Sequence, residues 1–355
     1  MSASVAHTSV VHTSAPTHAH YTTLGLDSRK VAIWAFIGSE CMLFVSLIST
    51  YLIYKGRSVV GPFPHETWTD PSTGQVFKPI LNIPVTSAST FVLLMSSLFM
   101  VLALAAVQNK DLPKRTRGDR ILGNSRLWLF MTALAGATFL GFQAYEFTSF
   151  VHEGLTIRRN LFGSTFFTLT GFHGAHVTAG VLWLVTLLAI DYRRGLAPKD
   201  SLLVDICALY WHFVDVVWIV IFTLVYLLKK IGGTMDTHAM KVPDSAEASL
   251  HAPTSEVEHS HPTWSTYWKV ALILTLITVA EVWAYYIPSF VASRGFVPTL
   301  LILSALKFTI VVMFYMHLKY DHRLFRVLFT GPLLIASLTL LALMFLFGHL
   351  YIKVM

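Results

Sequence analysis

Charged residues are scarce in this sequence. Asp, Glu, Lys and Arg make up 13% of the 355 residues, whereas 54% are hydrophobic. A soluble globular domain carries roughly a quarter of charged residues, so this composition excludes a soluble enzyme of ordinary type. The chain instead contains runs of about 20 apolar residues, each long enough to cross a bilayer as a helix. We therefore predict an all-α, polytopic membrane protein with eight transmembrane helices.

Cysteine is almost absent. The two cysteines, Cys41 and Cys207, both fall inside predicted spans, which excludes a disulfide framework and a thiolate metal site. The spans also lack the Glu-x-x-His pattern of di-iron helices, so no metal site is expected on this chain. The net charge of +7 comes from loops beside helix ends, where basic residues set membrane topology. No nucleic-acid partner is implied.

The hydrophobic pattern divides the chain into four segments. Residues 1–29 are predicted to be a flexible cytoplasmic tail, because they hold Ser, Thr, Ala and four histidines without periodicity. Residues 30–229 form a five-helix domain, residues 230–265 a polar, His-rich linker, and residues 266–355 a three-helix domain. The eight spans are expected at about residues 31–54, 85–107, 127–150, 161–190, 208–228, 267–287, 297–318 and 328–352.

Basic residues between the spans give conflicting orientations for the two domains. The densest basic loop, from Lys110 to Arg126, favours a cytoplasmic amino terminus, and five spans then leave the linker outside. The charges of Lys319, Arg323 and Arg326 favour a cytoplasmic loop after the seventh span, which would place the linker inside. A polar linker should not cross the bilayer. We expect the three-helix domain to follow the larger one, with this loop outside.

Six ionisable residues lie within the five-helix spans. A charged side chain inside a bilayer costs several kcal/mol, so such residues usually face protein, water or a partner. Glu40 lies about 13 Å inside the membrane and shares a layer with Asp215, so a polar contact between the two is expected to be feasible. Two interpretations remain: proton handling or lipid-headgroup binding, and interhelical hydrogen bonds worth about 0.6 kcal/mol each. We favour the functional one for Glu40. The full set is Glu40, Glu146, His173, His176, His212 and Asp215.

Haem ligation is the main chemical alternative for the histidines. Membrane haem proteins use histidine pairs from facing helices, but His173 and His176 lie on one helix. A facing pair is geometrically possible only if His173 or His176 pairs with His212 of another helix. Nothing in the sequence requires such a pair, so we favour a chain that binds no haem. Small residues at Ala133, Ala137 and Gly141, and at Gly171, Ala175 and Ala179, predict close helix contacts.

Glu281 and Lys307 are the deepest ionisable residues of the sixth and seventh spans. Counted from the turn that joins these spans, they lie at depths of about 10 Å and 14 Å, and the lysine stem can close this difference. We predict a buried, structural ion pair that holds the two helices in register.

Four stretches together resemble subunit III of the haem-copper oxygen reductases, in its five-helix form. They are residues 36–42 (FIGSECM), 141–147 (GFQAYEF), 162–177 (FGSTFFTLTGFHGAHV) and 210–218 (YWHFVDVVW). Residues 274–282, 305–307 and 311–318 are similar to the small subunit IV of bacterial caa3-type oxidases. The chain thus resembles a fusion of subunits III and IV.

The resemblance implies a role without redox centres. In this family haem and copper belong to subunits I and II, while subunit III packs beside subunit I, binds phospholipids and sustains proton uptake. Glu40 matches the family's intramembrane carboxylate, and His173, His176, His212 and Asp215 match its polar helix positions. The implied location is the bacterial inner membrane, and membership of a larger respiratory supercomplex stays open.

The subunit IV-like part favours cytochrome c as the electron donor of such a complex, with quinol as the alternative. A free-standing transporter is a weaker alternative, because it would show repeated halves and helices broken at mid-membrane.

Overall fold

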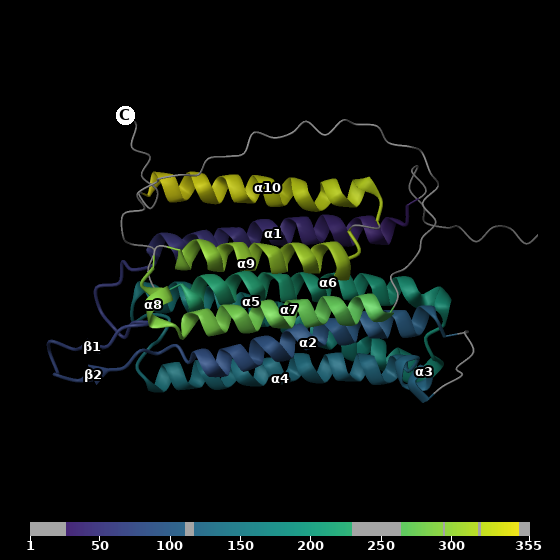
Figure 1. Ribbon diagram of the computed structural model, residues 1–355, viewed down its shortest axis with the longest axis horizontal. Helices are drawn as coiled ribbons and strands as arrows, with labels where there is room; N and C mark the ends of the chain where they lie inside the picture. The colour runs from purple at the N-terminus through teal and green to yellow at the C-terminus, as the bar shows by residue number, and fades with distance from the viewer. Residues whose placement is uncertain (1–25, 111–116, 229–263, 294, 319–320, 348–355) are drawn as a thin grey trace, which may run out of the picture.

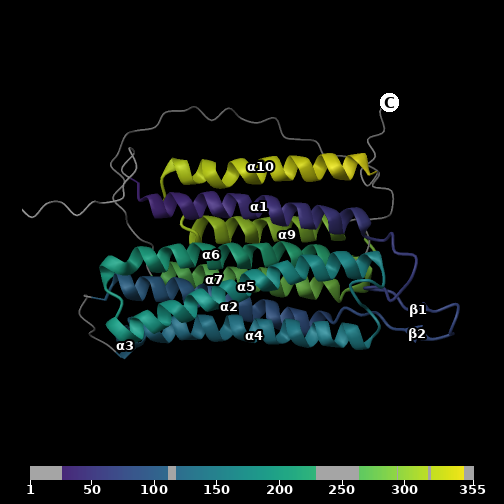
Figure 2. The ribbon, with the colours of Figure 1, turned by 180° about the vertical axis from the view of Figure 1, so that it is seen from behind.

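The computed structural model describes residues 26–110, 117–228, 264–293, 295–318 and 321–347. Within them, eight helices are long and apolar enough to span a membrane, and they lie side by side as one bundle (Figures 1 and 2). The spanning helices are α1 (Ser28–Tyr54), α2 (Ile83–Gln108), α4 (Ser125–His152), α5 (Leu161–Arg194), α6 (Ser201–Ile221), α7 (Trp264–Tyr285), α9 (Phe296–Ile310) and α10 (Arg323–Leu346).

Short elements complete these spans and join them. Two spans end in π-helical turns, η2 (Phe222–Leu227) after α6 and η3 (Val311–Tyr315) after α9. The connecting helices are α3 (Arg117–Leu122), η1 (Pro198–Asp200) and α8 (Pro288–Val291). Strands β1 (Trp68–Thr69) and β2 (Val76–Phe77) pair antiparallel, Trp68 opposite Phe77, in the loop between α1 and α2. The predicted all-α, eight-helix membrane fold is confirmed.

Local sequence fixes where several helices begin. The side chains of Asp27, Asn82, Asn124 and Asn160 each accept a hydrogen bond from a backbone N–H in the first turn of α1, α2, α4 and α5. These caps satisfy amide groups that have no partner inside the helix. Helix α5 ends at Gly195, whose φ of 72° is a conformation that favours glycine.

Helix α6 is the centre of the bundle. Most residues of α6 and η2 are buried and none is exposed, whereas α1, α5 and α9 each expose large apolar side chains. A helix that is apolar on all sides, as this one is, belongs in such a core. Helices α1, α2, α5 and α9 all pack against it, so α6 is the element through which both domains meet.

Contacts at the two ends of α1 fix the relative direction of the domains. At its start, the Lys30 Nζ lies 3.2 Å from Asp205 of α6 and 2.9 Å from Asp321, just before α10. At its end, Arg57 donates to the Phe347 carbonyl oxygen, which follows α10. Helix α10 is therefore parallel to α1, and the turn before α10 lies at the end of the bundle where α1 begins.

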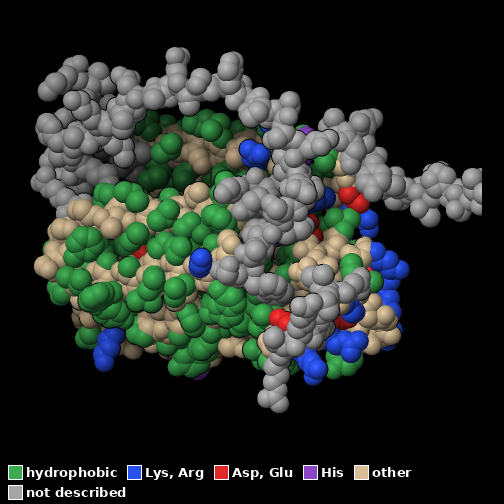
Figure 3. Space-filling view, turned by 45° about the vertical axis from the view of Figure 1, so that its right-hand side comes forward, with side chains coloured by type: hydrophobic (Ala, Val, Ile, Leu, Met, Phe, Trp, Pro, Cys, Tyr) green, Lys and Arg blue, Asp and Glu red, His purple; other side chains and the backbone are tan. Residues whose placement is uncertain are grey.

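This direction corrects the orientation expected for the three-helix domain. Tyr267, near the start of α7, contacts the His317 ring at the same end of the bundle as Lys30, whereas Leu228 lies at the opposite end, beside Lys55. Lys and Arg side chains gather at the end of the bundle where α1 begins (Figure 3). Helix α10, whose first turn carries Arg323 and Arg326, starts next to Asp321 at this end. The expectation that the loop after the seventh span lies outside is wrong, because packing of α10 on α1 overrides it. Lys319 and residues 230–263 of the predicted linker lie outside the described residues, and α7 begins at Trp264, two residues before the predicted start of the three-helix domain.

Cysteine labelling can test this topology. We expect His322→Cys and Lys199→Cys to react with a membrane-impermeant maleimide from the cytoplasmic side only, because both sites are exposed at the end where α1 begins. Ser72→Cys and Ser293→Cys, exposed at the other end, should react from the outer side only. The native Cys41 and Cys207 are buried. If His322→Cys reacted together with Ser72→Cys, the parallel arrangement of α1 and α10 would be refuted.

Lys55 follows the last residue of α1 and contacts the end of the fifth span. Its ammonium donates to the carbonyl oxygens of Leu224 and Leu228 at 2.8 and 2.6 Å, where η2 has no further turn to satisfy them. Burial lowers the pKa of Lys55 from 10.5 to about 7, although these two hydrogen bonds favour the charged form. Lys55 thereby ties the first and fifth spans together at the outer end.

Of the six small residues predicted to make close helix contacts, Ala133 is buried in the core and the other five are not. Gly141 and Gly171 have open space where a Cβ would stand, and Ala137, Ala175 and Ala179 are exposed. The glycines of α4 and α5 that meet a neighbouring helix lie on adjacent faces: Gly136, Gly174 and Gly180. The predicted contact faces of α4 and α5 were therefore displaced around the helix axis from the observed ones. Residues three and four apart lie close together on a helix, so a spacing of small residues alone does not distinguish one face from the next.

Candidate functional site

Glu40 and His176 form a polar pair between α1 and α5. The Glu40 Oε2 lies 3.1 Å from the His176 Nε2, and each side chain is 16% exposed. The Phe44 ring packs against the imidazole at 5.0 Å. The contact expected between Glu40 and Asp215 is replaced by this one, because His176 projects from α5 towards α1.

The hydrogen bonds of His176 determine how many protons the pair holds. Its Nδ1 lies 2.7 Å from the Phe172 carbonyl oxygen, an acceptor only, so Nδ1 carries a hydrogen. The Nε2 then either accepts from a protonated Glu40 or, as an imidazolium, donates to a carboxylate. The Glu40–His176 contact therefore contains one proton in either state, and that proton can move between the two groups.

Asp215 and His212 meet at Ser97 of α2. The Ser97 hydroxyl donates to the Asp215 Oδ2 at 2.7 Å, and the His212 Nδ1 lies 3.1 Å from the same Oγ. Since the serine hydrogen is used by the carboxylate, the imidazole donates from Nδ1. His212 and Asp215 lie three residues apart on α6, and Ser97 of α2 joins their side chains.

Two tryptophans extend this contact along α6. Trp211 Nε1 donates to the Ser96 Oγ and Trp218 Nε1 donates to the Thr90 Oγ1, both at 2.9 Å. Helix α2 supplies both of these acceptors. The signal was the spacing of Thr86, Thr90 and Ser97, which puts hydroxyls on one side of an apolar helix.

Glu146 and His173 lie in separate surroundings. Glu146 of α4 accepts hydrogen bonds from the hydroxyls of Thr86 and Tyr226 and is buried. His173 donates to the Val214 carbonyl oxygen at 3.2 Å, and its ring packs against Trp218 at 4.8 Å between centroids. Both groups join helices, and His173 also interacts electrostatically with His176.

The histidines that could have ligated haem each have a different partner. His173 contacts a backbone carbonyl, His176 a carboxylate and His212 a serine hydroxyl, so no two face one another. Among the described residues, no group of three His, Cys, Asp or Glu side chains is arranged to hold a metal ion. The histidines of the amino-terminal tail and of the linker lie outside the described residues.

The ion pair expected in the three-helix domain is present. The Lys307 Nζ of α9 lies 2.5 Å from the Glu281 Oε2 of α7, and the two side chains are 1% and 0% exposed. The helical hairpin brings the two groups to one layer, as their distances from the turn required. The lysine also interacts electrostatically with Asp215 of α6, so the pair lies where the two domains meet.

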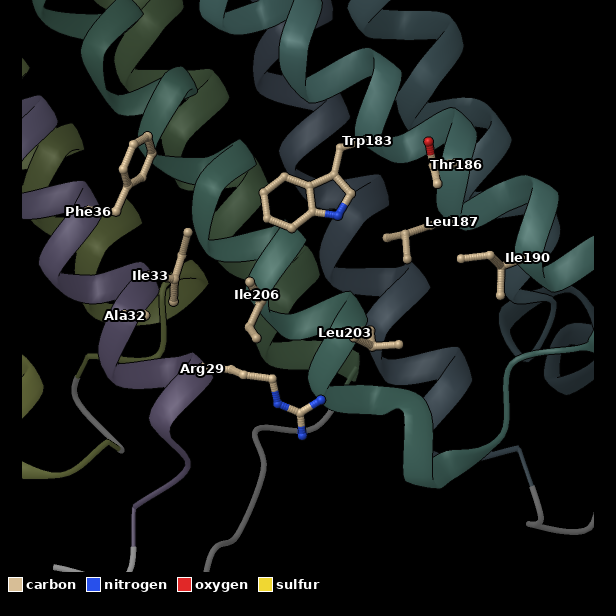
Figure 4. Close-up of a pocket in the computed structure, with 10 residues that line it drawn as sticks. All are labelled: Arg29, Ala32, Ile33, Phe36, Trp183, Thr186, Leu187, Ile190, Leu203 and Ile206. Atoms are coloured by element: carbon tan, nitrogen blue, oxygen red, sulfur yellow. The ribbon is translucent and has the colours of Figure 1, made fainter. Parts of the chain in front are cut away.

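An open apolar groove of about 510 Å³ lies at the end of the bundle where α1 begins (Figure 4). Helices α1, α5 and α6 form its walls, and the Arg29 guanidinium lies at its edge. The ten lining residues are Arg29, Ala32, Ile33, Phe36, Trp183, Thr186, Leu187, Ile190, Leu203 and Ile206. An apolar channel with one cation at its edge has the chemistry of a phospholipid site, with chains inside and a phosphate outside.

Comparison with known proteins identifies both parts of the chain. Residues 2–230 match the family model for cytochrome c oxidase subunit III, and residues 268–341 match that for prokaryotic cytochrome c oxidase subunit IV. The match to subunit III covers more than half of the chain.

Curated relatives support the first match. Cytochrome c oxidase subunit 3 of Bacillus sp. (strain PS3) is 38% identical over 59% of this chain and 90% of its own length. Quinol oxidase subunit 3 of Bacillus subtilis (strain 168) is 36% identical over 57% of this chain and 88% of its own length. Cytochrome bo(3) ubiquinol oxidase subunit 3 of Pseudomonas aeruginosa is 35% identical over 55% of this chain and 82% of its own length. With its eight apolar helices, the chain is a multi-pass protein of the bacterial inner membrane. It belongs to the subunit III family of the haem-copper oxidases and carries a subunit IV-like domain at its carboxyl end.

Proposed function

We propose that this chain is the component of a proton-pumping terminal oxidase that supports proton uptake and lipid binding, without a redox centre of its own. Haem and copper would reside in subunits I and II, where oxygen is reduced, and the chain would pack beside subunit I. The relatives include both cytochrome c and quinol oxidase subunits. The subunit IV-like domain favours cytochrome c as the donor, with quinol as the alternative.

The Glu40–His176 pair carries the proposal of proton handling. It holds one proton between two groups 3.1 Å apart, at a partly exposed position inside the membrane. A purely structural contact would not need an ionisable acid here, since glutamine could donate the same hydrogen bond without the desolvation cost of a carboxylate. The pair can thus take a proton from one side and release it to a neighbouring subunit.

Replacement of Glu40 tests this role. We expect Glu40→Gln to slow proton uptake and shorten the turnover lifetime of the purified oxidase reconstituted in vesicles, because the amide keeps the shape but cannot exchange a proton. A hydrophobic carbodiimide should label Glu40 in intact membranes. Glu146→Gln is the control, since that buried acid has fixed donors in Thr86 and Tyr226. Unchanged pumping and lifetime in Glu40→Gln would refute the proposal.

The groove between α1, α5 and α6 supports the proposal of phospholipid binding. Its walls are apolar, its volume accommodates part of a pair of acyl chains, and Arg29 offers a cation for a phosphate. Arg29 also pairs with Asp27 at 3.1 Å and is 57% exposed, so it would add to binding modestly rather than dominate it. Burial of apolar chains would supply most of the affinity.

Native mass spectrometry of the detergent-purified complex can measure this binding. We expect Ala32→Trp, which fills the groove, to remove one retained phospholipid. Arg29→Gln should weaken phosphatidylglycerol by about fivefold relative to phosphatidylcholine, since one basic residue near an anionic lipid contributes about 1 kcal/mol. Trp268→Ala, on an exposed face of α7, is the matched control. Equal lipid retention in Ala32→Trp and the parent chain would exclude the groove.

A further inference from the structure

Two carboxylates face one ammonium group where the domains meet. Lys307 of α9 contacts Glu281 of α7 at 2.5 Å and interacts with Asp215 of α6. None of the three side chains is more than 1% exposed. If all three were charged, the buried junction would carry one uncompensated negative charge. Such a charge is expensive away from water, whereas binding a proton removes it.

No other group compensates this charge among the described residues. Lys307 is the cation that interacts with Asp215 and with Glu281. His212 donates to Ser97 and interacts electrostatically with His317, whose ring lies against Tyr267. The Tyr315 ring lies 5.4 Å from His212 and its hydroxyl interacts with Asp215, but a phenol brings no positive charge.

Three buried polar atoms around this junction have no hydrogen-bond partner. They are Glu281 Oε1, Tyr315 Oη and His212 Nε2, and each belongs to a side chain at most 1% exposed. The carboxylate oxygen and the imidazole nitrogen accept, and the phenol donates. Water can serve both kinds of group, and buried polar atoms without protein partners commonly bind it.

We propose that the junction of the two domains is a buried binding site for water and one proton, shared between Asp215 and Glu281. The proton resides on one carboxyl while Lys307 pairs with the other. Transfer moves it from the Glu281 carboxyl to a bound water as the water gives a proton to the Asp215 carboxylate, so atoms and charge balance. Ser97 and His212 fix the Asp215 end. The site is distinct from the Glu40–His176 pair and does not depend on its role.

Infrared difference spectroscopy on the whole purified oxidase tests the shared proton. We expect the wild-type spectrum near neutral pH to contain the carbonyl stretch of one protonated carboxyl at the junction, which comparison with the variants separates from the bands of other carboxyls such as Glu40. Because the proton is shared, the band should disappear in both Asp215→Asn and Glu281→Gln, since the remaining carboxylate then pairs with Lys307 alone. Lys307→Met should double the band, because both carboxyls become neutral.

Lys30 offers a matched control, because it too faces two carboxylates, Asp205 and Asp321. These side chains are 14% exposed, so water screens them and Asp205→Asn should change only carboxylate bands. A wild-type structure of the whole oxidase at a resolution that shows water gives an independent test. We expect ordered water in contact with at least two of the three unpartnered atoms. A dry junction, or a wild-type spectrum in which both carboxyls are ionised, overturns the proposal.

Discussion

Replacement of Lys307 by methionine should lower the stability of the protein by about 3 to 5 kcal/mol, because it leaves Glu281 and Asp215 buried without a cation. Glu281→Leu should cost less, since Lys307 still faces Asp215. The double variant should recover part of the loss, because a buried ion pair exchanged for apolar side chains of similar volume is often tolerated. The thermal midpoint and the assembled fraction of the complex after purification measure both effects.

A surface ion pair serves as the control for this cycle. Arg159 and Asp70 lie 3.8 Å apart, and Arg159 is 40% exposed, so Arg159→Met should change stability much less than Lys307→Met does. The proposed coupling would be contradicted by strictly additive losses at Lys307 and Glu281, since independent sites add and interacting ones do not.

The ion pair was predictable from the sequence because two features constrain it independently. Charges inside a membrane span are costly, so each needs a partner, and distance from the hairpin turn sets the depth of each residue. The spans were predictable for a similar reason, as the bilayer sets their length. The fifth span begins earlier than expected, at Ser201, because its first polar turns pack against neighbouring helices instead of lipid.

Partners across helices were not predictable, because they depend on helix rotation. Glu40 and Asp215 were expected at one depth, yet His176 and Ser97 are their contacts. A depth argument gives the layer of a residue but not the direction of its side chain, and a helix turns by about 100° per residue. The direction of the three-helix domain was predicted wrongly because the basic loops of the two domains favour opposite orientations. The packing of α10 parallel to α1 allows only one of them.

The contacts of Trp211 show how strongly packing constrains the rotation of α6 about its axis. Its ring lies against two glycines: a Cβ at Gly136 would stand 2.5 Å from the ring, and a Cβ at Gly180 would stand 2.8 Å from it. Its Nε1 donates to Ser96, so one side chain of α6 contacts α2, α4 and α5. The ring is 1% exposed, and no smaller residue can fill the space between the two glycines and the serine.

We expect Trp211→Ala to destabilise the protein by about 3 to 5 kcal/mol, the usual cost of removing a buried aromatic side chain, and to reduce assembly of the complex. Gly136→Ala should cost about 1 to 3 kcal/mol by overpacking against the Trp211 ring. Trp268→Ala, at a site that is 50% exposed, should have little effect on the thermal midpoint.

The two positions should also interact. In a Trp211→Phe background the ring no longer reaches the space above Gly136, so Gly136→Ala should cost less there than in the parent chain. Equal costs in the two backgrounds would show that the glycine serves another contact, for which Val181 is the candidate, since its Cγ2 would lie 2.8 Å from the added methyl group. The cycle therefore tests whether the Trp211 ring, rather than Val181, limits the size of the residue that α4 can carry at position 136.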